Sequence, residues 1–335
     1  MKALILAGGS GERFWPLSTP DNPKQFLKLF DGKSLLRMTF ERIVRKLELK
    51  DVFVVTTRKY AEMTLEEIPE LPKENLIIEP TRRNTAPAIT YSMFRIPEHE
   101  TVLVLPSDHY IPNVKKFWKI MERAEDFLER NEGCLLTFGV VPTRPETSYG
   151  YIEKGEEIEE NVYRVKRFRE KPSYEVAEEF LESGSFFWNT GMFMWKVETF
   201  LHEMEKLFPS ILLPLRESGE KGYEKVPSIS IDYALMERTE NACVIKADFE
   251  WSDVGNWKSL EDLGYKKEGR LITVDADGIY SLSEKPVLVV GVSDIVIVES
   301  DSGLLVASKK DLEKIREGVK RIIMEFDRHG KKEVK

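Results

Sequence analysis

The stretch LILAGGSGERFWPLSTPDNPKQF, residues 4 to 26, carries the first structural signal of the chain. The apolar run Ala3–Ala7 predicts a buried strand, and glycines 8, 9 and 11 follow it at once. Glycine permits tight turns and lets the backbone approach a ligand closely. Three interpretations are open for such a loop: a dinucleotide-binding turn, a triphosphate-binding loop of another kind, and a plain tight turn.

Two of the known nucleotide loops do not match this stretch. A dinucleotide loop reads G-x-G-x-x-G, but Phe14 stands where its third glycine belongs, and no acid ends the next strand, VVTTR. A Walker loop fails too, because Leu27 stands where the first glycine before Gly32-Lys33-Ser34 belongs. What remains is a loop whose backbone N–H groups approach phosphates, with Arg13 and Lys24 supplying charge, or a turn with two solvated cations.

Composition restricts the class of protein. The chain has 335 residues, 41% of them hydrophobic, and a net charge of −8, so we expect a globular protein that does not bind nucleic acid. The first apolar run is too short for a signal peptide, and none approaches the roughly 20 residues of a membrane span. Cys134 and Cys243 form no C-x-x-C pair, which argues against a disulfide framework or a cysteine zinc site. We therefore expect a cytoplasmic protein without membrane partners.

Short apolar runs alternate with helical patterns over the first half of the chain. This rhythm predicts an α/β fold with a mostly parallel mixed sheet, in which ligands lie at the carboxyl ends of the strands. The predicted strands are 3–7, 52–56, 76–78, 102–105 and 135–140, and the predicted helices are 34–47, 61–68, 86–94 and 115–129.

The sequence pattern changes near residue 268. Short apolar runs separated by Asp, Gly and Ser turns occupy 271–307, and an amphipathic helix follows them. We predict a catalytic domain at 1–267 and a small C-terminal β-stack, similar to a β-helix, with a terminal helix at 268–335. Its apolar strands suit a homodimer.

Eight motifs in order resemble the sugar-1-phosphate nucleotidyltransferases, and within them the mannose-1-phosphate guanylyltransferases. They are LAGGSGERFWPLS, PKQF, EPTRRNTAPA, PSDH, YGYI, REKP, FWNTGMFMW and WSDVGNW, between residue 1 and about residue 310. The resemblance implies a Rossmann-like fold of the GT-A type. It also implies Mg²⁺ and a reaction of GTP with mannose 1-phosphate to give GDP-mannose and pyrophosphate. Bifunctional relatives carry a further cupin domain with isomerase activity, which we do not expect of a chain of this length.

The resemblance assigns roles to individual residues. The implied catalytic residues are Arg13, Lys24 and Asp108, and the implied metal ligands are Asp108 and Asp253. The implied nucleotide-binding residues are Leu6, Ala7, Gly8, Gly9, Gly11, Glu79, Asn84, Thr85 and Ser107. The implied sugar-phosphate-binding residues are Gly150, Glu170, Lys171, Asn189 and Asp253. Each also has an ordinary explanation, such as a turn aspartate, a helix cap or a surface ion pair.

Glu79 bears on the choice of base. It follows the strand 76–78, so its side chain should lie at the carboxyl edge of the sheet. An ionised carboxylate only accepts hydrogen bonds and matches the two neighbouring donors of guanine. An ordinary surface glutamate is the competing interpretation.

Two other functions stay open at this stage. One is transfer to another hexose 1-phosphate, such as that of glucose or fucose. The other is a non-catalytic sensor of sugar nucleotides on the same fold, although the presence of Arg13, Lys24, Asp108 and Asp253 argues against it.

Overall fold

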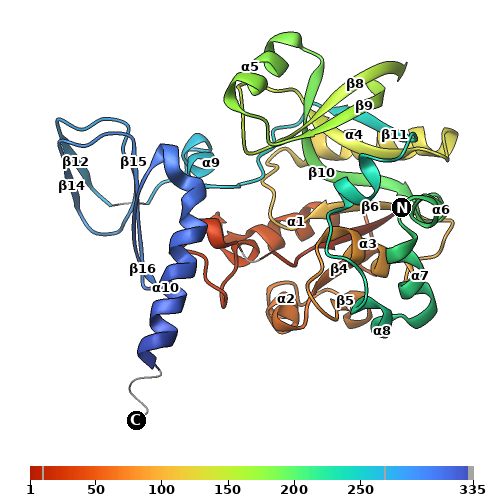
Figure 1. Ribbon diagram of the computed structural model, residues 1–335, viewed down its shortest axis with the longest axis horizontal. Coiled ribbons are helices and arrows are strands. Elements are labelled where there is room, and N and C mark those ends of the chain that lie inside the picture. The colour runs from red at the N-terminus through yellow and green to blue at the C-terminus, as the bar shows by residue number, and fades with distance from the viewer. Residues whose placement is uncertain (10, 268, 331–335) are drawn as a thin grey trace. The chain divides into compact units, whose positions relative to one another are not determined.

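The computed structural model contains a sheet of nine strands, which forms the centre of the larger of its two compact units (Figure 1). The structure describes residues 1–9, 11–267 and 269–330, without the side chains of 326–330. Two compact units contain them: residues 1–8 with 39–251, and residues 9–38 with 252–335. The domain boundary predicted between residues 267 and 268 stays a prediction.

The sheet has the order β5-β4-β1-β6-β10-β7-β11-β9-β8. β10 and β9 run opposite to the other seven strands, so the prediction of a mostly parallel mixed sheet is confirmed. The strands are β1 (Lys2–Leu6), β4 (Val52–Thr57), β5 (Leu76–Glu79), β6 (Thr101–Pro106), β7 (Leu135–Val140), β8 (Gly150–Glu159), β9 (Val162–Glu170), β10 (Phe186–Lys196) and β11 (Ala242–Ala247).

Helices follow the strands in the order that the apolar pattern predicts. They are α2 (Ala61–Glu67), α3 (Thr85–Met93), α4 (Val114–Arg130), α5 (Tyr174–Ser183), α6 (Val197–Leu207), α7 (Pro209–Ser218), α8 (Glu220–Tyr223) and the π-helix η6 (Asp232–Met236), with 3-10 turns η3 (Leu49–Asp51), η4 (Arg58–Tyr60) and η5 (Lys73–Asn75). α1 (Leu35–Ile43) spans the division between the units and ends four residues before the predicted Leu47. Fully buried side chains from β1, β6, β10, α3 and α6 share one core.

The second unit begins with the loop after Gly8 and contains the C-terminal strands. Its elements are η1 (Glu12–Phe14), η2 (Lys24–Phe26), β2 (Lys28–Phe30), β3 (Lys33–Ser34), α9 (Trp257–Asp262), β12 (Leu271–Val274), β13 (Tyr280–Leu282), β14 (Val287–Val290), β15 (Ile295–Ser300), β16 (Gly303–Ser308), η7 (Lys309–Lys314) and α10 (Ile315–Gly330). β12 pairs in parallel with β14, and β13 with β15. Alternate strands thus stack as in two coils of a β-helix, which confirms the predicted β-stack and terminal helix.

The topology creates one switch point in the large sheet. β1 lies between β4 and β6 and is parallel to both. After β1 the chain first adds β4 and β5 on one side of it and then adds β6 on the other side. The carboxyl ends of parallel strands at such a point form the crevice in which α/β proteins bind ligands. β1 and β6 are the strands that precede the glycines and Asp108.

Candidate active site

Backbone hydrogen bonds join the ends of β1 and β6. Ser107 N donates to Leu6 O over 3.0 Å, and Ala7 N donates to Val55 O over 2.8 Å. Thr56 Oγ1 donates to Ala7 O over 2.9 Å. The predicted residues Leu6, Ala7 and Ser107 thus lie together, with Asp108 next in the chain. The structure leaves Asp108 partly exposed at this edge.

α1 holds the segment that carries Asp108 from the other side. Thr39 Oγ1 donates to Ser107 O over 3.2 Å, and Arg42 Nη2 donates to His109 O over 3.2 Å. Arg42 is buried, and burial lowers the pKa of its guanidinium to about 10. A buried cation that donates to this carbonyl fixes the backbone immediately after Asp108.

His109 makes a second contact through its ring. Trp251 Nε1–H donates to His109 Nδ1 over 3.1 Å, and the two rings meet edge to face at 5.5 Å. An accepting Nδ1 identifies a neutral ring with its proton on Nε2. The contact holds the His109 ring against Trp251.

Glu79 is buried beside Gly8. It is 4% exposed, and Tyr223 Oη donates to its Oε2 over 2.8 Å. Its Oε1 lies 3.0 Å from the position that a Cβ on Gly8 would take, so a larger residue at position 8 would press on the carboxylate. Burial raises the pKa of Glu79, opposed by the Tyr223 hydrogen bond and the charge of Arg82. This burial excludes the surface-glutamate interpretation.

Asn84 caps α3 and Thr85 is its first residue, one position before the predicted start at residue 86. Asn84 has φ of 70° and its side chain accepts from Thr85 N over 2.8 Å. Thr85 Oγ1 accepts from Ile231 N over 2.8 Å. The Thr85 hydroxyl therefore holds the segment before η6 in place, whereas the Asn84 side chain is exposed.

Four of the five predicted sugar-phosphate residues meet at the start of β8, and the fifth, Asp253, belongs to the second unit. A Cβ on Gly150 would lie 3.0 Å from Glu170 Oε2 and 3.4 Å from Asn189 Cβ, so only glycine leaves this space open. Lys171 Nζ lies 3.0 Å from Glu170 Oε1, and both side chains are exposed. Gly150, Glu170, Lys171 and Asn189 therefore form one group, which we call the β8–β9 end.

Asp232 joins this group although the sequence reasoning missed it. Asn189 Nδ2 donates to Asp232 Oδ1 over 2.8 Å, and Asn189 Oδ1 accepts from Gly191 N over 3.0 Å. Burial raises the pKa of Asp232, opposed by the hydrogen bond from Asn189. Asp232 opens a π-helix, an element frequent at functional sites, but no short motif announced it.

In the second unit, Gly11 packs directly on Lys24. Gly11 has φ of 63°, and a Cβ there would lie 2.5 Å from Lys24 N and Lys24 Cβ. Both the backbone conformation and this approach require glycine. Arg13 lies in η1 and is partly exposed, and Gly9 has open space at its Cα. The predicted loop residues Gly9, Gly11, Arg13 and Lys24 thus belong to one unit.

Lys24 also reaches the predicted metal ligand Asp253. Its side chain is 7% exposed, and Nζ donates to Asp253 O over 2.6 Å. A Cβ on Gly255 would lie 2.8 Å from Asp253 Oδ1, so glycine makes room for the carboxylate. Val254 between them has φ of 45°, a strained conformation for a β-branched residue and of a kind that concentrates at functional sites.

The two aspartates have the chemistry that Mg²⁺ needs. Mg²⁺ usually takes one or two carboxylates and completes its shell with water and substrate phosphates. Accordingly, no group of three or more His, Cys, Asp or Glu side chains in the described residues is placed to hold a metal. Gly255 allows the Asp253 carboxylate to lie against the backbone, and carboxylate oxygens are ligands that Mg²⁺ accepts.

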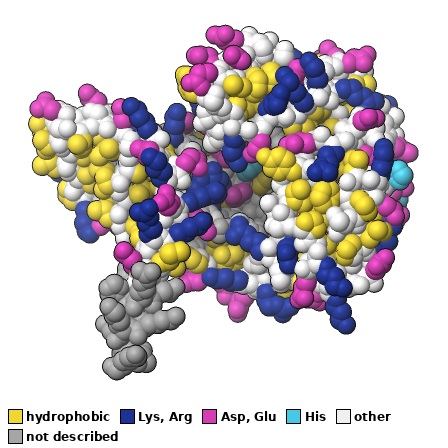
Figure 2. All heavy atoms as spheres, viewed as in Figure 1, with side chains coloured by type: hydrophobic (Ala, Val, Ile, Leu, Met, Phe, Trp, Pro, Cys, Tyr) yellow, Lys and Arg dark blue, Asp and Glu magenta, His cyan; other side chains and the backbone are white. Residues whose placement is uncertain are grey.

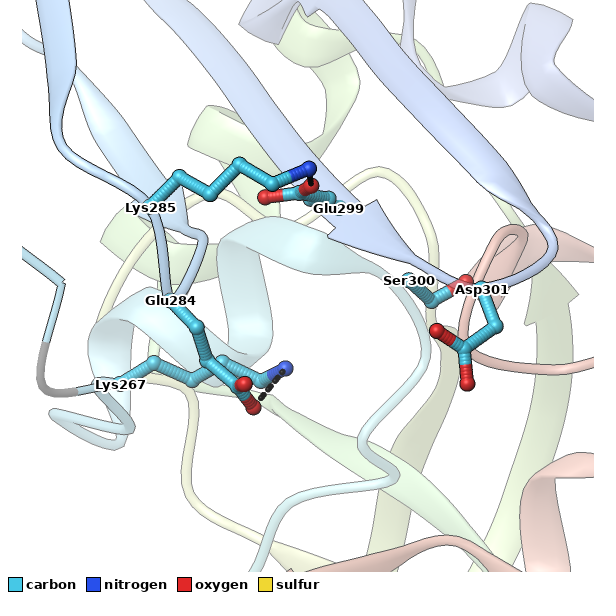
Figure 3. Close-up of a pocket in the computed structure, with 6 residues that line it drawn as sticks. All are labelled: Lys267, Glu284, Lys285, Glu299, Ser300 and Asp301. Carbon is cyan, nitrogen blue, oxygen red and sulfur yellow. Dashed lines mark hydrogen bonds and ion pairs between the residues drawn. The ribbon is translucent and has the colours of Figure 1, made fainter.

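A polar cavity of about 600 Å³ lies in the second unit (Figure 3). Its lining residues lie between positions 267 and 301 of the sequence, and none of them is a predicted site residue. Lys285 forms an ion pair with Glu299, and Lys267 one with Glu284 at 3.4 Å. These four charges neutralise each other in pairs.

None of the helices in the described part of the chain is long and apolar enough to cross a membrane.

The glycine loop and Asp108 follow the carboxyl ends of two neighbouring parallel strands, which is where α/β proteins bind their ligands. Comparison with known proteins is more specific. The chain belongs to the nucleotidyl transferase family, whose model matches residues 2–269.

The chain is similar to several curated and solved proteins. A mannose-1-phosphate guanylyltransferase of Escherichia coli is 36% identical over 99% of this chain and 77% of its own length. A crystal structure described as mannose-1-phosphate geranyltransferase from Thermus thermophilus is 35% identical, has a TM-score of 0.85 and covers 96% of this chain and 98% of its own. A structure described as mannose-6-phosphate isomerase from Helicobacter pylori is 32% identical, has a TM-score of 0.64 and covers 75% and 98%.

Proposed function

We propose that this chain transfers GMP from GTP to mannose 1-phosphate and produces GDP-mannose and pyrophosphate. The observation that carries the proposal is the hydrogen bond from Ser107 N to Leu6 O, which brings the start of the glycine loop beside the residue that precedes Asp108. The names of the curated relatives support the same substrates.

The reaction needs no general base. A phosphate monoester has a second pKa of about 6, so an oxygen of the sugar phosphate is already ionised at neutral pH and attacks the α-phosphorus directly. The protein must hold repelling anions together and offset the charge that develops on pyrophosphate. We assign this work to Arg13 and Lys24. When bound at Asp108 and Asp253, Mg²⁺ supplies further positive charge for the phosphates.

Lys24 has two tasks in this proposal. Its buried ammonium adds positive potential, which acts strongly where water is excluded. Its hydrogen bond to Asp253 O also fixes the backbone that presents the Asp253 carboxylate.

Glu79 selects guanine in this proposal. Its Oε2 accepts a hydrogen bond from Tyr223, and its Oε1 lies close to the backbone of Gly8. Guanine N1–H and N2–H are donors that a carboxylate accepts, whereas the corresponding nitrogen of adenine is an acceptor. Glu79→Gln should lower kcat/KM for GTP by a factor that corresponds to about 1–3 kcal/mol of transition-state stabilisation. The kcat/KM for UTP should fall less. An unchanged GTP preference would contradict this role.

The β8–β9 end binds the sugar in this proposal. Glu170 and Asn189 offer a carboxylate and an amide to vicinal hydroxyls, and Lys171 offers a cation to the phosphate. Asp232 fixes the amide of Asn189 so that its second Nδ2 hydrogen has a defined direction. Gly150 has no side chain, so Glu170 and Asn189 lie close to its backbone.

Pyrophosphate release tests the function directly. GTP, ATP, UTP and dTTP are each combined with mannose, glucose and fucose 1-phosphates. The proposal expects the highest kcat/KM with GTP and mannose 1-phosphate. A maximum with another sugar would favour a different hexose 1-phosphate, and binding of GDP-mannose without release in any mixture would favour the sensor.

We further propose that the C-terminal strands join two copies of the chain. β12 and β14 expose apolar side chains of 39–64%, and Figure 2 shows hydrophobic side chains gathered over this part of the second unit. They are Leu271, Ile272, Val274, Leu288 and Val290. Monomers rarely expose apolar patches of this kind. Light scattering should show a dimer, and the double variant Ile272→Lys, Leu288→Lys should be a monomer. A monomeric wild type would refute the proposed dimer.

We also propose that the protein is located in the cytoplasm.

A further inference from the structure

Two buried thiols touch in the large sheet, at a site that the transfer reaction does not use. Cys134 directly precedes β7, and Cys243 lies in the neighbouring strand β11. Their Sγ atoms are 2.9 Å apart, and the Cys243 thiol donates to Cys134. A disulfide bond is about 2.05 Å long, so a movement of about 1 Å would join the sulfurs.

Arg164 lies over both sulfurs. It pairs in register with Cys243 across β9 and β11, and its Nη1 is 3.7 Å from Cys243 Sγ and 3.9 Å from Cys134 Sγ. Within the described part of the chain, no ion pair joins this guanidinium to a carboxylate. Its positive charge therefore acts on the sulfurs, and a neighbouring arginine is a known way to favour a thiolate.

The two cysteines differ in acidity. The hydrogen bond from Cys243 lowers the pKa of the Cys134 thiol to about 7, with help from Arg164 and against burial. The pKa of the Cys243 thiol is raised, because its S–H is donated to Cys134 and because it is buried. We therefore expect Cys134 to react first and Cys243 to resolve the product formed on it.

We propose that Cys134 and Cys243 form a redox-active dithiol, which a hydroperoxide converts into a disulfide between the segment before β7 and strand β11. The Cys134 thiolate attacks one oxygen of hydrogen peroxide, the O–O bond breaks, and the departing hydroxide takes a proton and leaves as water. Cys134 then carries a sulfenic acid. The Cys243 sulfur attacks the sulfenic sulfur, its proton leaves with the hydroxyl as a second water, and the S–S bond forms. The two sulfurs lose two electrons, which the peroxide accepts.

Burial sets the size of the oxidant. Cys134 is 5% exposed and Cys243 is 0% exposed, while the Arg164 side chain above them is exposed. A molecule as small as hydrogen peroxide therefore reaches Cys134 first. Bulky thiol reagents should leave both cysteines unmodified in the folded protein.

Thiol counting on the full-length protein tests the proposal. The protein is treated with hydrogen peroxide, the peroxide is removed, and free thiols are measured after denaturation. The thiol count should fall from two to none, the mass should fall by about 2 Da, and dithiothreitol should restore both. A non-reducing peptide map should link the Cys134 and Cys243 peptides. Two thiols that persist, a gain of oxygen without the link, or dimers linked between chains would each overturn the proposal.

Single variants separate the two roles. Cys243→Ser should accumulate a sulfenic acid that dimedone traps, whereas Cys134→Ser should react at least tenfold more slowly. Arg164→Leu should slow disulfide formation severalfold, and Arg169→Leu on the same strand is the matched control and should not. Equal rates in the two arginine variants would remove Arg164 from the site. Should a cysteine variant fail to fold, the arginine pair and the peptide map still decide the question.

Discussion

Trp251 Nε1–H donates to His109 Nδ1 over 3.1 Å, and each residue is a close chain neighbour of a predicted metal ligand. His109 follows Asp108 directly, and Trp251 precedes Asp253 by two residues. This hydrogen bond therefore joins the segment that follows Asp108 to the segment that precedes Asp253.

Removal of this hydrogen bond should weaken turnover more than stability. Trp251→Phe should lower kcat roughly threefold to tenfold and raise the Mg²⁺ concentration for half-maximal activity, because one hydrogen bond contributes about 1 kcal/mol. His109→Asn keeps an acceptor and should retain more activity than His109→Leu. Trp195→Phe is the control, because the described structure gives the buried Trp195 Nε1 no hydrogen-bond partner. Equal losses in Trp195→Phe and Trp251→Phe would refute the positioning role.

Substitution of the two aspartates should abolish most of the activity. Asp108→Asn and Asp253→Asn should each lower kcat roughly 10²- to 10³-fold, the scale for loss of one electrostatic stabiliser, while the melting temperature stays near that of the wild type. Chelation with EDTA should stop turnover, and added Mg²⁺ should restore it. Mn²⁺ binding in the presence of GTP, followed by electron paramagnetic resonance, should weaken in both variants. Near-normal turnover in either variant would remove that aspartate from the metal site.

Loss of the Lys24 ammonium should act on the triphosphate and on stability together. Lys24→Met should lower kcat with little change in KM for mannose 1-phosphate, and its melting temperature should fall because Asp253 O loses a buried donor. Lys28→Met, at an exposed position on β2, is the control and should change neither. A rise in KM for the sugar phosphate alone would show that Lys24 clamps that substrate instead.

Glu79 should make stability depend on pH in an unusual direction. Burial raises its pKa above the ordinary value of 4.5, so the folded state holds the proton more tightly than the unfolded state. The stability from this group is therefore complete below pH 4.5 and declines as the pH rises through the folded pKa. Glu79→Gln should melt higher than the wild type at pH 7, and the difference should vanish near pH 4. Glu74→Gln, on the exposed turn η5, should show no such trend; a constant difference for Glu79→Gln at all pH values would contradict the argument.

Asp232 should affect the sugar and not the nucleotide. Asp232→Ala removes the acceptor of Asn189 Nδ2 and should raise KM for mannose 1-phosphate roughly tenfold, with KM for GTP nearly unchanged. Glu237→Gln removes a nearby exposed carboxylate as a control. A change in KM for GTP alone would place Asp232 on the nucleotide side.

Local patterns were enough to predict the elements around β1 and β6. Apolar runs bounded by glycine or proline predict these strands to within one residue, and Ser107 and Asp108 follow directly from where a strand ends. The pattern Asn84-Thr85 before an apolar run indicates a helix cap at one of these two residues, and the structure places it at Asn84.

Contacts between distant segments could not be predicted in the same way. Asp232 meets Asn189 over 43 residues of sequence, and Cys134 meets Cys243 over 109. Nothing in the motif FWNTGMFMW shows that β10 runs antiparallel between β6 and β7. The depth at which Glu79 lies likewise depends on Tyr223, which comes from a helix far along the chain.

The second unit takes its residues from both ends of the chain, and this limits how the protein can be divided. Ser300 Oγ donates to Pro16 O over 2.8 Å, and Gly303 leaves room for the ring of Trp15, so the C-terminal strands support the segment that follows the glycine loop. The C-terminal strands therefore cannot be exchanged for those of a relative independently of residues 9–38. Recombination that replaced only residues 268–335 would strip the loop of its fitted support, and a functional chimera would have to inherit residues 9–38 from the same parent.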